Sequence, residues 1–403
     1  MKKRIAFVVN TLSGGGAEKT VSNLSRGLAD KYNIDIIVND TQHLEYPYRG
    51  HIVSLNMPPD KGVMGAAYQI QILIRRTKVL RYLKKKKKYT AVLSFSEMCN
   101  VANVLSGNKY GKTIVSVRNS ILKGKDSSWM HKLISPVLLP WCYRTSDKTV
   151  SCSKGIADEL REHYGLMQEK SAVVYNGVDL PLIRKKTVEV LTEEEKKDWA
   201  GKQLIVTVGR LTRQKGQIHL IRAVMDLIGR GISVHLLILG EGELRETLES
   251  EAEKLSINDS VSFTGFVENP YKYMANAAVV VMPSLYEGMC NVILEALACG
   301  VPVISTDHET GAREILAPKT DYKKKVTDRI DEAAYGILVP VCGENSGRTE
   351  RNLSKEEMLM ADAIEKILTD DALAAHYKTM ASERVEQMDI RSACEQWSRL
   401  IEE

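Results

Sequence analysis

Long apolar stretches are missing from this sequence, and cysteines are few. No run of about 18 uncharged apolar residues occurs, so no membrane-spanning helix is predicted. The seven cysteines, an odd number scattered without close pairs, argue against a disulfide framework and against a zinc site. The 403 residues are 44% hydrophobic and 27% charged, values ordinary for a globular chain, which excludes a disordered or fibrous protein.

The start of the chain has the basic and apolar character of an export signal. Lys2, Lys3 and Arg4 precede the apolar stretch at 5–9. Five residues are fewer than the roughly 7–15 that an export signal needs. We therefore interpret this stretch as the first β-strand of a cytoplasmic protein.

Charge is unevenly distributed along the chain. The formal net charge is +5, but residues 1–180 hold 28 Lys and Arg against 14 Asp and Glu, and the remainder holds 28 against 37. Such an asymmetry predicts that the first half faces something anionic.

Short apolar stretches alternate with helical ones along the chain, which is typical of parallel α/β sheets. The series is interrupted once, by a charged segment near 180–201. We predict an α/β fold of two doubly wound, Rossmann-like domains facing across a cleft. The expected divisions are an N-terminal domain at 1–180, a linker at 181–200, a C-terminal domain at 201–385, and a helix at 386–403 that packs back on the N-terminal domain. The predicted strands are 5–10, 34–38, 91–95, 113–117, 149–151, 172–175, 204–208, 234–239, 261–264, 279–282, 301–305 and 336–339.

A glycine loop follows the first predicted strand. Three glycines at 14–16 stand between a strand and a helix, where backbone amides can approach an anion. Gly14 and Gly16 also fit the first two positions of a dinucleotide fingerprint, but the third falls on Lys19. A phosphate- or sugar-facing loop, a nicotinamide site and a structural turn all remain possible interpretations.

Two cations follow the first strand of the second domain. Arg210 comes directly after the strand, and Lys215 stands just before the next helix. A cation at a helix N-terminus opposes the helix dipole unless an anion also binds there. The pair therefore predicts a phosphate site that also uses helix amides, the alternative being two solvated charges.

Two carboxylates lie eight positions apart in the segment at 283–302. Glu287 precedes a predicted helix and Glu295 interrupts its apolar face. A carboxylate near a helix start can be a simple cap. A buried one costs several kcal/mol unless it is hydrogen-bonded, and ligand hydroxyls would satisfy Glu295.

These motifs together resemble those of a retaining glycosyltransferase of the GT-B fold, glycosyltransferase family 4, of the kind that builds surface polysaccharides. The resemblance rests on the glycine loop, Gly-Arg-Leu at 209–211 with Lys-Gly at 215–216, Leu-Gly-Glu-Gly at 239–242, Phe-Thr-Gly-Phe at 263–266 and Glu-x₇-Glu at 287–295. It covers nearly the whole chain and is densest at about 204–316.

The resemblance implies roles for individual residues. Arg210 and Lys215 would neutralise the donor diphosphate, and Glu287 would hold hydroxyls of the transferred sugar. Glu295 would accept hydrogen bonds from the ribose hydroxyls. The other implied donor contacts are Gly15, Gly16, Gly209, Phe266, Val267, Gly288, Met289, Cys290 and Asn291.

The reaction implied by the resemblance needs neither a metal ion nor a cofactor, because the nucleotide sugar is a co-substrate. The sequence agrees in having no Asp-x-Asp motif. It departs from the family at the end of a first-domain strand, where many members carry a histidine and this chain has Arg118 and Asn119. We predict that these two residues contact acceptor or sugar, the alternative being a salt-bridged structural arginine.

The basic residues of the first half concentrate in one segment. Nine Lys and Arg and no acid lie between 75 and 88, with apolar residues near helical spacing. The pattern predicts an amphipathic helix at 70–88 on an anionic membrane surface, with 129–143 and its two tryptophans as a second contact. The alternative is a solvated helix face. Nucleic acid is not an expected partner, since only Tyr82 and Tyr89 could stack on bases near this run.

We therefore expect a retaining glycosyltransferase at the cytoplasmic, inner face of the cell membrane. It would move a hexose or N-acetylhexosamine from a nucleotide sugar, with UDP favoured, to a lipid-pyrophosphate-linked or growing surface-polysaccharide acceptor. One alternative is a nucleotide-sugar epimerase, which would turn over the donor without an acceptor. The other is a non-catalytic scaffold subunit, which predicts the loss of Glu287, Arg210 or Lys215.

Overall fold

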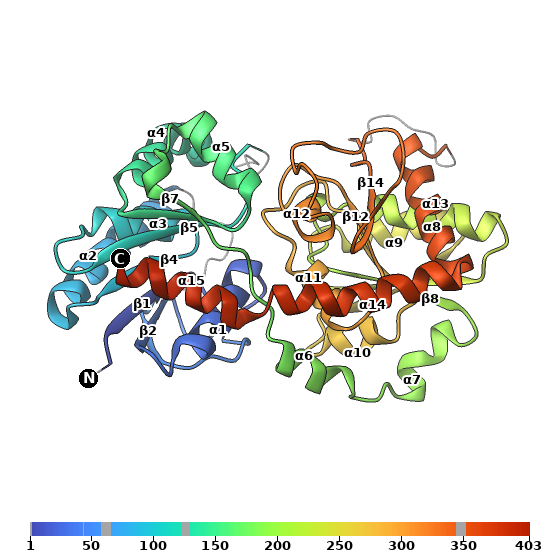
Figure 1. Ribbon diagram of the computed structural model, residues 1–403, viewed down its shortest axis with the longest axis horizontal. Coiled ribbons are helices and arrows are strands. Elements are labelled where there is room, and N and C mark those ends of the chain that lie inside the picture. The colour runs from blue at the N-terminus through green and yellow to red at the C-terminus, as the bar shows by residue number, and fades with distance from the viewer. Residues whose placement is uncertain (1, 43, 58–65, 123–128, 344–351) are drawn as a thin grey trace. The chain divides into compact units, whose positions relative to one another are not determined.

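The computed structural model describes residues 2–42, 44–57, 66–122, 129–343 and 352–403, and only the backbone of 66–68 and 129–136. Contacts divide the chain into two units, Met1–Gly177 with Met388–Glu403, and Val178–Gln387. These boundaries lie near the predicted ones at 180 and 385, and the last helix belongs to the first unit. Figure 1 shows the chain coloured from end to end.

The segment predicted as a linker is part of the second unit. Helix α6 (Leu180–Thr187) begins where the Asp179 carboxylate accepts a hydrogen bond from the Leu182 amide. Helix α7 (Glu193–Lys196) begins with a capping box formed by Thr192 and Glu195. The linker prediction was wrong because the many charges lie on exposed helix faces, while Leu180, Ile183 and Leu191 are buried.

The first unit is built on a seven-stranded parallel sheet in the order β3-β2-β1-β4-β5-β6-β7. Its strands are β1 (Arg4–Val8), β2 (Asn33–Val38), β3 (His51–Ser54), β4 (Ala91–Ser94), β5 (Lys112–Val117), β6 (Lys148–Ser151) and β7 (Ser171–Val173). Its helices are α1 (Gly16–Leu28), α2 (Ala66–Lys87), α3 (Glu97–Leu105), α4 (Trp129–Thr145), α5 (Lys154–Tyr164), the 3-10 turn η1 (Gln168–Lys170) and α15 (Ile390–Glu402).

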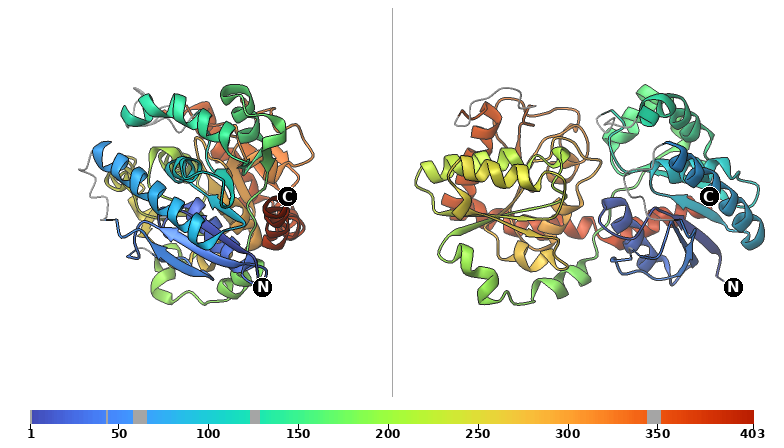
Figure 2. Two further views of the ribbon diagram at one scale, coloured as in Figure 1. Left: turned by 90° about the vertical axis from the view of Figure 1, so that its left-hand side faces the viewer. Right: turned by 180° about the vertical axis from the view of Figure 1, so that it is seen from behind.

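Alternate residues of β1 pack on opposite faces of the first sheet. Ile5 and Phe7 join the core formed with α1 and α15, whereas Ala6 and Val8 join the core formed with α2 and α3. Figure 2 shows α2 and α15 on opposite sides of this sheet. A strand buried on both faces reads as a continuous apolar run, which is why β1 was recognisable in the sequence.

The second unit repeats this architecture with one reversed edge strand. Its sheet has the order β10-β9-β8-β11-β12-β14-β13, and only β13 is antiparallel to its neighbour. Its strands are β8 (Gln203–Val208), β9 (Val234–Leu239), β10 (Val261–Gly265), β11 (Val279–Met282), β12 (Val303–Thr306), β13 (Asp331–Ala333) and β14 (Gly336–Val339). Besides α6 and α7 it contains η2 (Lys197–Trp199), η3 (Arg213–Lys215), α8 (Gln217–Gly229), α9 (Arg245–Lys254), η4 (Asn258–Ser260), α10 (Pro270–Ala275), α11 (Asn291–Ala298), α12 (Ala312–Leu316), α13 (Lys355–Thr369) and α14 (Asp371–Gln387).

Both sheets are doubly wound, so each has a point where the strand order reverses. In the first unit this point lies between β1 and β4, and in the second between β8 and β11. Ligands of open α/β sheets bind outside the carboxyl ends of the strands at such a point. The loops after β1, β8 and β11 are therefore where each unit offers a binding site.

Candidate active site

The turn after β8 and the loop after β11 meet at the switch point of the second sheet. Gly216 has a φ of 63°, and a Cβ added there would lie 2.2 Å from the Pro283 carbonyl oxygen. The Leu285 amide donates to the Gln214 carbonyl oxygen at 2.8 Å. A glycine at 216 is thus required for the backbone approach that brings Lys215 beside Glu287.

Lys215 and Glu287 form an ion pair inside this junction. The Lys215 Nζ lies 2.5 Å from Glu287 Oε1, and the side chains are only 15% and 10% exposed. The Ser284 hydroxyl also donates to Oε1, at 2.9 Å, and Gln214 Nε2 donates to Oε2 at 3.4 Å. The carboxylate is therefore held in place from three residues.

The ion pair shifts the proton affinities of both groups. Burial by itself raises the pKa of Glu287, but the charge and hydrogen bond of Lys215 outweigh it and hold that pKa below its usual value. Burial by itself lowers the pKa of Lys215, but the Glu287 carboxylate leaves it above its usual value. Both groups are therefore charged at neutral pH, and a cation and an anion lie together at this edge of the sheet.

Arg210 adds a second, solvent-accessible cation at this edge. It follows β8 and Gly209 directly and is exposed, and its carbonyl oxygen accepts a hydrogen bond from Gln217 Nε2 at 3.0 Å. Its positive charge acts on that of Lys215. An anion that binds here would relieve the repulsion between the two cations.

The start of α11 completes the site. Gly288, Met289 and Cys290 are buried before the helix begins at Asn291, and the first-turn amides of a helix lack intrahelical acceptors. Burial raises the pKa of Cys290 to about 12, so its thiol is protonated and is no nucleophile. Glu295, inside α11, is 5% exposed.

Phe266 and Val267 follow β10 at the same carboxyl edge of the sheet. Phe266 is 60% exposed, a high value for a phenylalanine. An exposed aromatic ring at a ligand-binding edge fits the nucleobase contact that the family resemblance implies for this position.

The first unit carries its own group of predicted residues. Gly15 is the N-cap of α1 and Gly16 its first residue, at the carboxyl end of β1. Arg118 follows β5; its Nη2 donates to Asn176 Oδ1 at 2.6 Å, and its guanidinium carbon lies 5.7 Å from the ring centre of Phe95. The Arg118 Nη1 has no hydrogen-bond partner among the described residues.

The Arg118 contacts do not match the salt-bridged structural arginine considered as the alternative. Within the described ranges its partners are an amide oxygen and an aromatic face, and no ion pair involves it. Asn119 is exposed, and its Oδ1 accepts from the Ser120 amide at 3.1 Å. Arg118 and Asn119 belong to one unit and Lys215 and Glu287 to the other, so the predicted cleft between domains stays a prediction.

The loop after β12 supports the site and was missed in the sequence. The Thr306 hydroxyl donates to the Ser284 carbonyl oxygen at 2.5 Å, and the Thr310 hydroxyl donates to that of Glu287. Gly311 has a φ of 91°, and a Cβ there would lie 2.7 Å from the Gly288 carbonyl oxygen. In the sequence, the only indication of this role was two threonines and a glycine at the end of a predicted buried strand and just after it.

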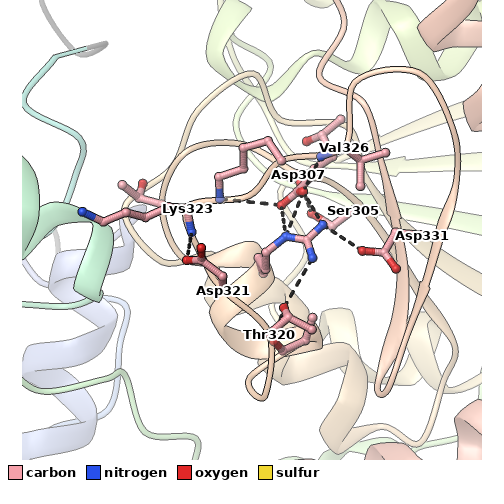
Figure 3. Close-up of polar contacts among 12 residues, drawn as sticks. Ser305, Asp307, Thr320, Asp321, Lys323, Val326 and Asp331 are labelled. Atoms are coloured by element: carbon pink, nitrogen blue, oxygen red, sulfur yellow. Dashed lines mark hydrogen bonds and ion pairs between the residues drawn. The ribbon is translucent and has the colours of Figure 1, made fainter.

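Asp307 anchors a longer stretch of chain behind this loop (Figure 3). Its carboxylate, wholly buried, accepts hydrogen bonds from Arg313 at 2.6 Å and from the Val326 amide at 2.9 Å, and Lys325 lies 3.7 Å away. Arg313 also pairs with Asp331 at 2.8 Å. One buried carboxylate thus fixes β12, α12 and the segment leading to β13.

The basic helix presents fewer cations than predicted. In α2, Arg76 and Lys84 are each 1% exposed. Lys84 Nζ donates to the carbonyl oxygens of Asn103 and Gly107 at 3.1 and 2.7 Å, and burial lowers its pKa to about 7. Lys87 pairs with the Asp35 carboxylate at 2.7 Å. These three side chains contact protein groups and are unavailable to a membrane.

The apolar face predicted for this helix was also wrong. Leu80 and Leu83 pack in the core of the first unit, whereas Ile70 and Ile74 are 43% and 48% exposed. The exposed cationic face of α2, as the structure defines it, consists of Ile70, Ile74, Arg75, Lys78, Arg81, Tyr82, Lys85 and Lys86, followed by Lys88. This face carries cations and apolar side chains together.

The second predicted membrane stretch, 129–143, coincides with most of α4. The side chains of Trp129, Lys132 and Leu133 lie outside the described residues. Val137 and Trp141 are exposed at 74% and 37%, and Leu139 is buried. In the part of the chain that the structure describes, no helix is both long and apolar enough to cross a bilayer. Across the same ranges, no three His, Cys, Asp or Glu side chains gather as a metal site.

Both units match families of known proteins. The family described as "Glycosyltransferase Family 4" matches residues 14–181, and "Glycosyl transferases group 1" matches 191–337. An uncharacterized glycosyltransferase of Methanocaldococcus jannaschii is 28% identical over 351 residues, covering 83% of this chain and 84% of that protein.

A Campylobacter jejuni enzyme matches over almost its full length. It is the N-acetylgalactosamine-N,N'-diacetylbacillosaminyl-diphospho-undecaprenol 4-alpha-N-acetylgalactosaminyltransferase, 28% identical over 390 residues and 96% of both chains. Among solved structures, HepE of Anabaena in complex with UDP and glucose has a TM-score of 0.74 at 18% identity, covering 99% of both chains.

Both units thus match glycosyltransferase families, and their two doubly wound sheets share the fold of the solved structure. The protein is therefore a glycosyltransferase of the GT-B fold.

Proposed function

We propose that this protein is a retaining transferase that moves a hexose or N-acetylhexosamine from a UDP-sugar to a lipid-diphosphate-linked saccharide. The observation that carries the proposal is the buried Lys215–Glu287 pair beside Arg210 at the switch point of the second sheet. When a nucleotide sugar binds, the two side chains of such a pair can separate. The lysine then binds the diphosphate, and the glutamate binds hydroxyls of the sugar.

The reaction places its charges where these residues lie. Breaking the bond between the sugar and the diphosphate leaves negative charge on the leaving group. Lys215 and Arg210 stabilise that charge together with the amides before α11, because preorganised donors in a partly buried site act strongly on developing charge. No step requires a metal ion from the protein.

Glu287 orients the sugar in this proposal. Its carboxylate is ionised and can accept hydrogen bonds from sugar hydroxyls once Lys215 turns to the diphosphate. The acceptor hydroxyl attacks from the face that the diphosphate leaves, and a leaving phosphate oxygen takes its proton. Glu295, in α11, accepts from the ribose, and the glycine loop of the first unit and Arg118 meet the remaining polar groups. The anomeric configuration of the product, read by NMR, tests retention.

Donor binding should stabilise the protein. At 100 times its dissociation constant a ligand adds about 2.7 kcal/mol, which for a unit of about 200 residues corresponds to a rise in Tm of roughly 5–10 °C. We expect UDP-sugars to give this shift in differential scanning fluorimetry, and the Lys215→Ala variant to lose most of it. If neither UDP- nor GDP-sugars move the Tm, the donor site is wrongly assigned.

An acceptor assay separates the rival functions. The protein is incubated with a UDP-sugar, with and without a membrane lipid extract. Product that forms only with lipid supports the transferase, and a new nucleotide sugar formed without lipid supports an epimerase. Binding without either product supports a scaffold, although Arg210, Lys215 and Glu287 are all present.

Two observations support a lipid-linked acceptor: the name of a related enzyme and the positive charge on α2. The Campylobacter jejuni enzyme is named for a diphospho-undecaprenol substrate. The exposed cationic face of α2 provides Lys78, Lys85 and Lys86 beside exposed Ile74 and Tyr82. Lysines attract anionic lipid surfaces, and the apolar side chains can enter the headgroup region. We propose that this face holds the enzyme at the inner surface of the membrane.

Replacing Lys78, Lys85 and Lys86 with Gln should weaken binding to phosphatidylserine vesicles by about a hundredfold at low salt, since each lysine contributes about 1 kcal/mol. Sedimentation measures the loss, and turnover with a water-soluble acceptor should not change. The matched control replaces the exposed Lys254, Lys355 and Lys378 of the second unit. Equal losses in both triple variants would remove the membrane assignment from α2.

A further inference from the structure

His308 is a buried histidine for which the donor site provides no hydrogen-bond partner. His308 is only 1% exposed, and neither nitrogen of its ring has a hydrogen-bond partner among the described residues. Buried polar atoms are bonded in the large majority of cases, and an unmade bond costs about 1–3 kcal/mol. A histidine left this way beside a ligand site indicates a group that arrives with the ligand.

The backbone holds His308 next to Glu287. His308 lies between Thr306, whose hydroxyl binds the Ser284 carbonyl oxygen, and Thr310, whose hydroxyl binds that of Glu287. The imidazole and the Glu287 carboxylate are close enough that each acts on the charge of the other. The ring therefore lies near Glu287, the acid that holds the sugar in the proposed function.

The imidazole is neutral at physiological pH. Burial lowers the pKa of His308 to about 4, against the raising effect of the Glu287 carboxylate; Lys325 lowers it further, and Asp307 and Glu309 raise it. A neutral ring has one N–H donor and one acceptor nitrogen. Such a ring does not attract a diphosphate, but it matches a hydroxyl or an acetamido group, each of which both donates and accepts.

The other buried histidines among the described residues of the second unit each have a partner on at least one ring nitrogen, and Nδ1 of His235 has none. His219 Nδ1 lies 2.8 Å from Glu357 Oε1, and His235 Nε2 lies 2.9 Å from the Ser262 hydroxyl. His235 is also 1% exposed with a pKa lowered to about 4 by burial, but it stands near the amino end of β9, at the opposite edge of the sheet. It is a matched control for His308.

We propose that His308 hydrogen-bonds a hydroxyl or acetamido group of the transferred sugar and thereby helps to select the donor. The inference rests on the proposed function, since it needs a sugar nucleotide at Glu287. The ring nitrogens are covered in the free protein, so the sugar reaches them as a neighbouring side chain moves.

The test compares UDP with UDP-sugars. Calorimetry gives the dissociation constants of UDP, UDP-glucose, UDP-N-acetylglucosamine and UDP-N-acetylgalactosamine for the wild type and for His308→Phe, which fills the space without polar atoms. The preferred UDP-sugar should lose about tenfold in affinity, the equivalent of one or two hydrogen bonds, while UDP itself binds as before. His308→Asn, whose amide keeps one donor and one acceptor, should recover part of the loss.

Two results would overturn the inference. Either UDP and UDP-sugar weaken equally in His308→Phe, which makes the residue structural, or neither dissociation constant changes, which means that the sugar does not contact the ring. His308→Ala gives the same readout if the Phe variant does not fold. His235→Asn should leave the ratio unchanged. Wild-type protein that binds no nucleotide sugar at all would instead contradict the proposed function, which is a different outcome.

Discussion

Lys215→Ala is expected to lower turnover by about a hundredfold or more, by analogy with the removal of other transition-state donors. The ammonium is the buried cation of the donor site, 2.5 Å from Glu287 Oε1, and no other described side chain donates to that oxygen except Ser284. Arg210→Ala should have a similar effect through the exposed cation. Initial rates at saturating UDP-sugar and acceptor measure both losses.

Removing Lys215 also leaves a buried carboxylate without its cation, so lost stability has to be separated from lost catalysis. The double variant Lys215→Ala/Glu287→Gln removes both charges and should recover much of the stability, but not the turnover. Lys202→Ala is the matched control, because Lys202 precedes the other end of β8 and its Nζ donates to the Asp259 carbonyl oxygen. Normal rates in Lys215→Ala and Arg210→Ala would show that the diphosphate binds elsewhere.

Asp307→Ala is expected to lower the free energy of unfolding by about 3–5 kcal/mol, the cost of breaking a buried ion pair from one side. The substitution leaves Arg313 and Lys325 without their buried carboxylate and the Val326 amide without its acceptor. Urea unfolding followed by circular dichroism measures the loss.

The control is Asp331→Ala, which removes the other acid bound to Arg313. The Asp331 side chain is 35% exposed and that of Asp307 is fully buried. An exposed pair contributes about 0–1 kcal/mol, so this variant should stay near the wild type. Equal effects of the two substitutions would show that burial of Asp307 does not govern the stability of this segment.

The central strands, which are buried on both faces, were recognised from sequence, as were the edge strands β7 and β10. Val234–Leu239, Val279–Met282 and Gly336–Val339 have the predicted bounds because apolar runs end where burial ends. The edge strands β3 (His51–Ser54) and β13 (Asp331–Ala333) were missed, since these short segments contain polar or charged residues and carry no such run. The two charged helices at 180–196 were taken for a linker for a related reason. Most of their residues lie on the exposed face, so their composition resembles that of an exposed linker.

The residues of the candidate site also fall into those that the sequence identified and those that it did not. Arg210, Lys215 and Glu287 stood out by residue type and spacing, because cations before a helix and acids within an apolar segment are unfavourable without a ligand. His308, Asp307 and Thr310 did not, since their significance depends on neighbours distant in sequence. Lys84 shows the reverse error: in sequence it belongs to a basic run, and in the fold it is buried and bound to carbonyl oxygens.

The sequence alone determined the fold class and pointed to the charged residues of the proposed donor site, because hydrophobic periodicity and unfavourable local charge are properties of short segments. Only the tertiary structure decided which charges meet. It paired Lys215 with Glu287, brought Asp307 to Arg313, buried Arg76 and Lys84 of α2, and paired Lys87 with Asp35. Whether a charge is solvated, paired or left for a ligand depends on burial, and burial is set by elements far apart in the chain.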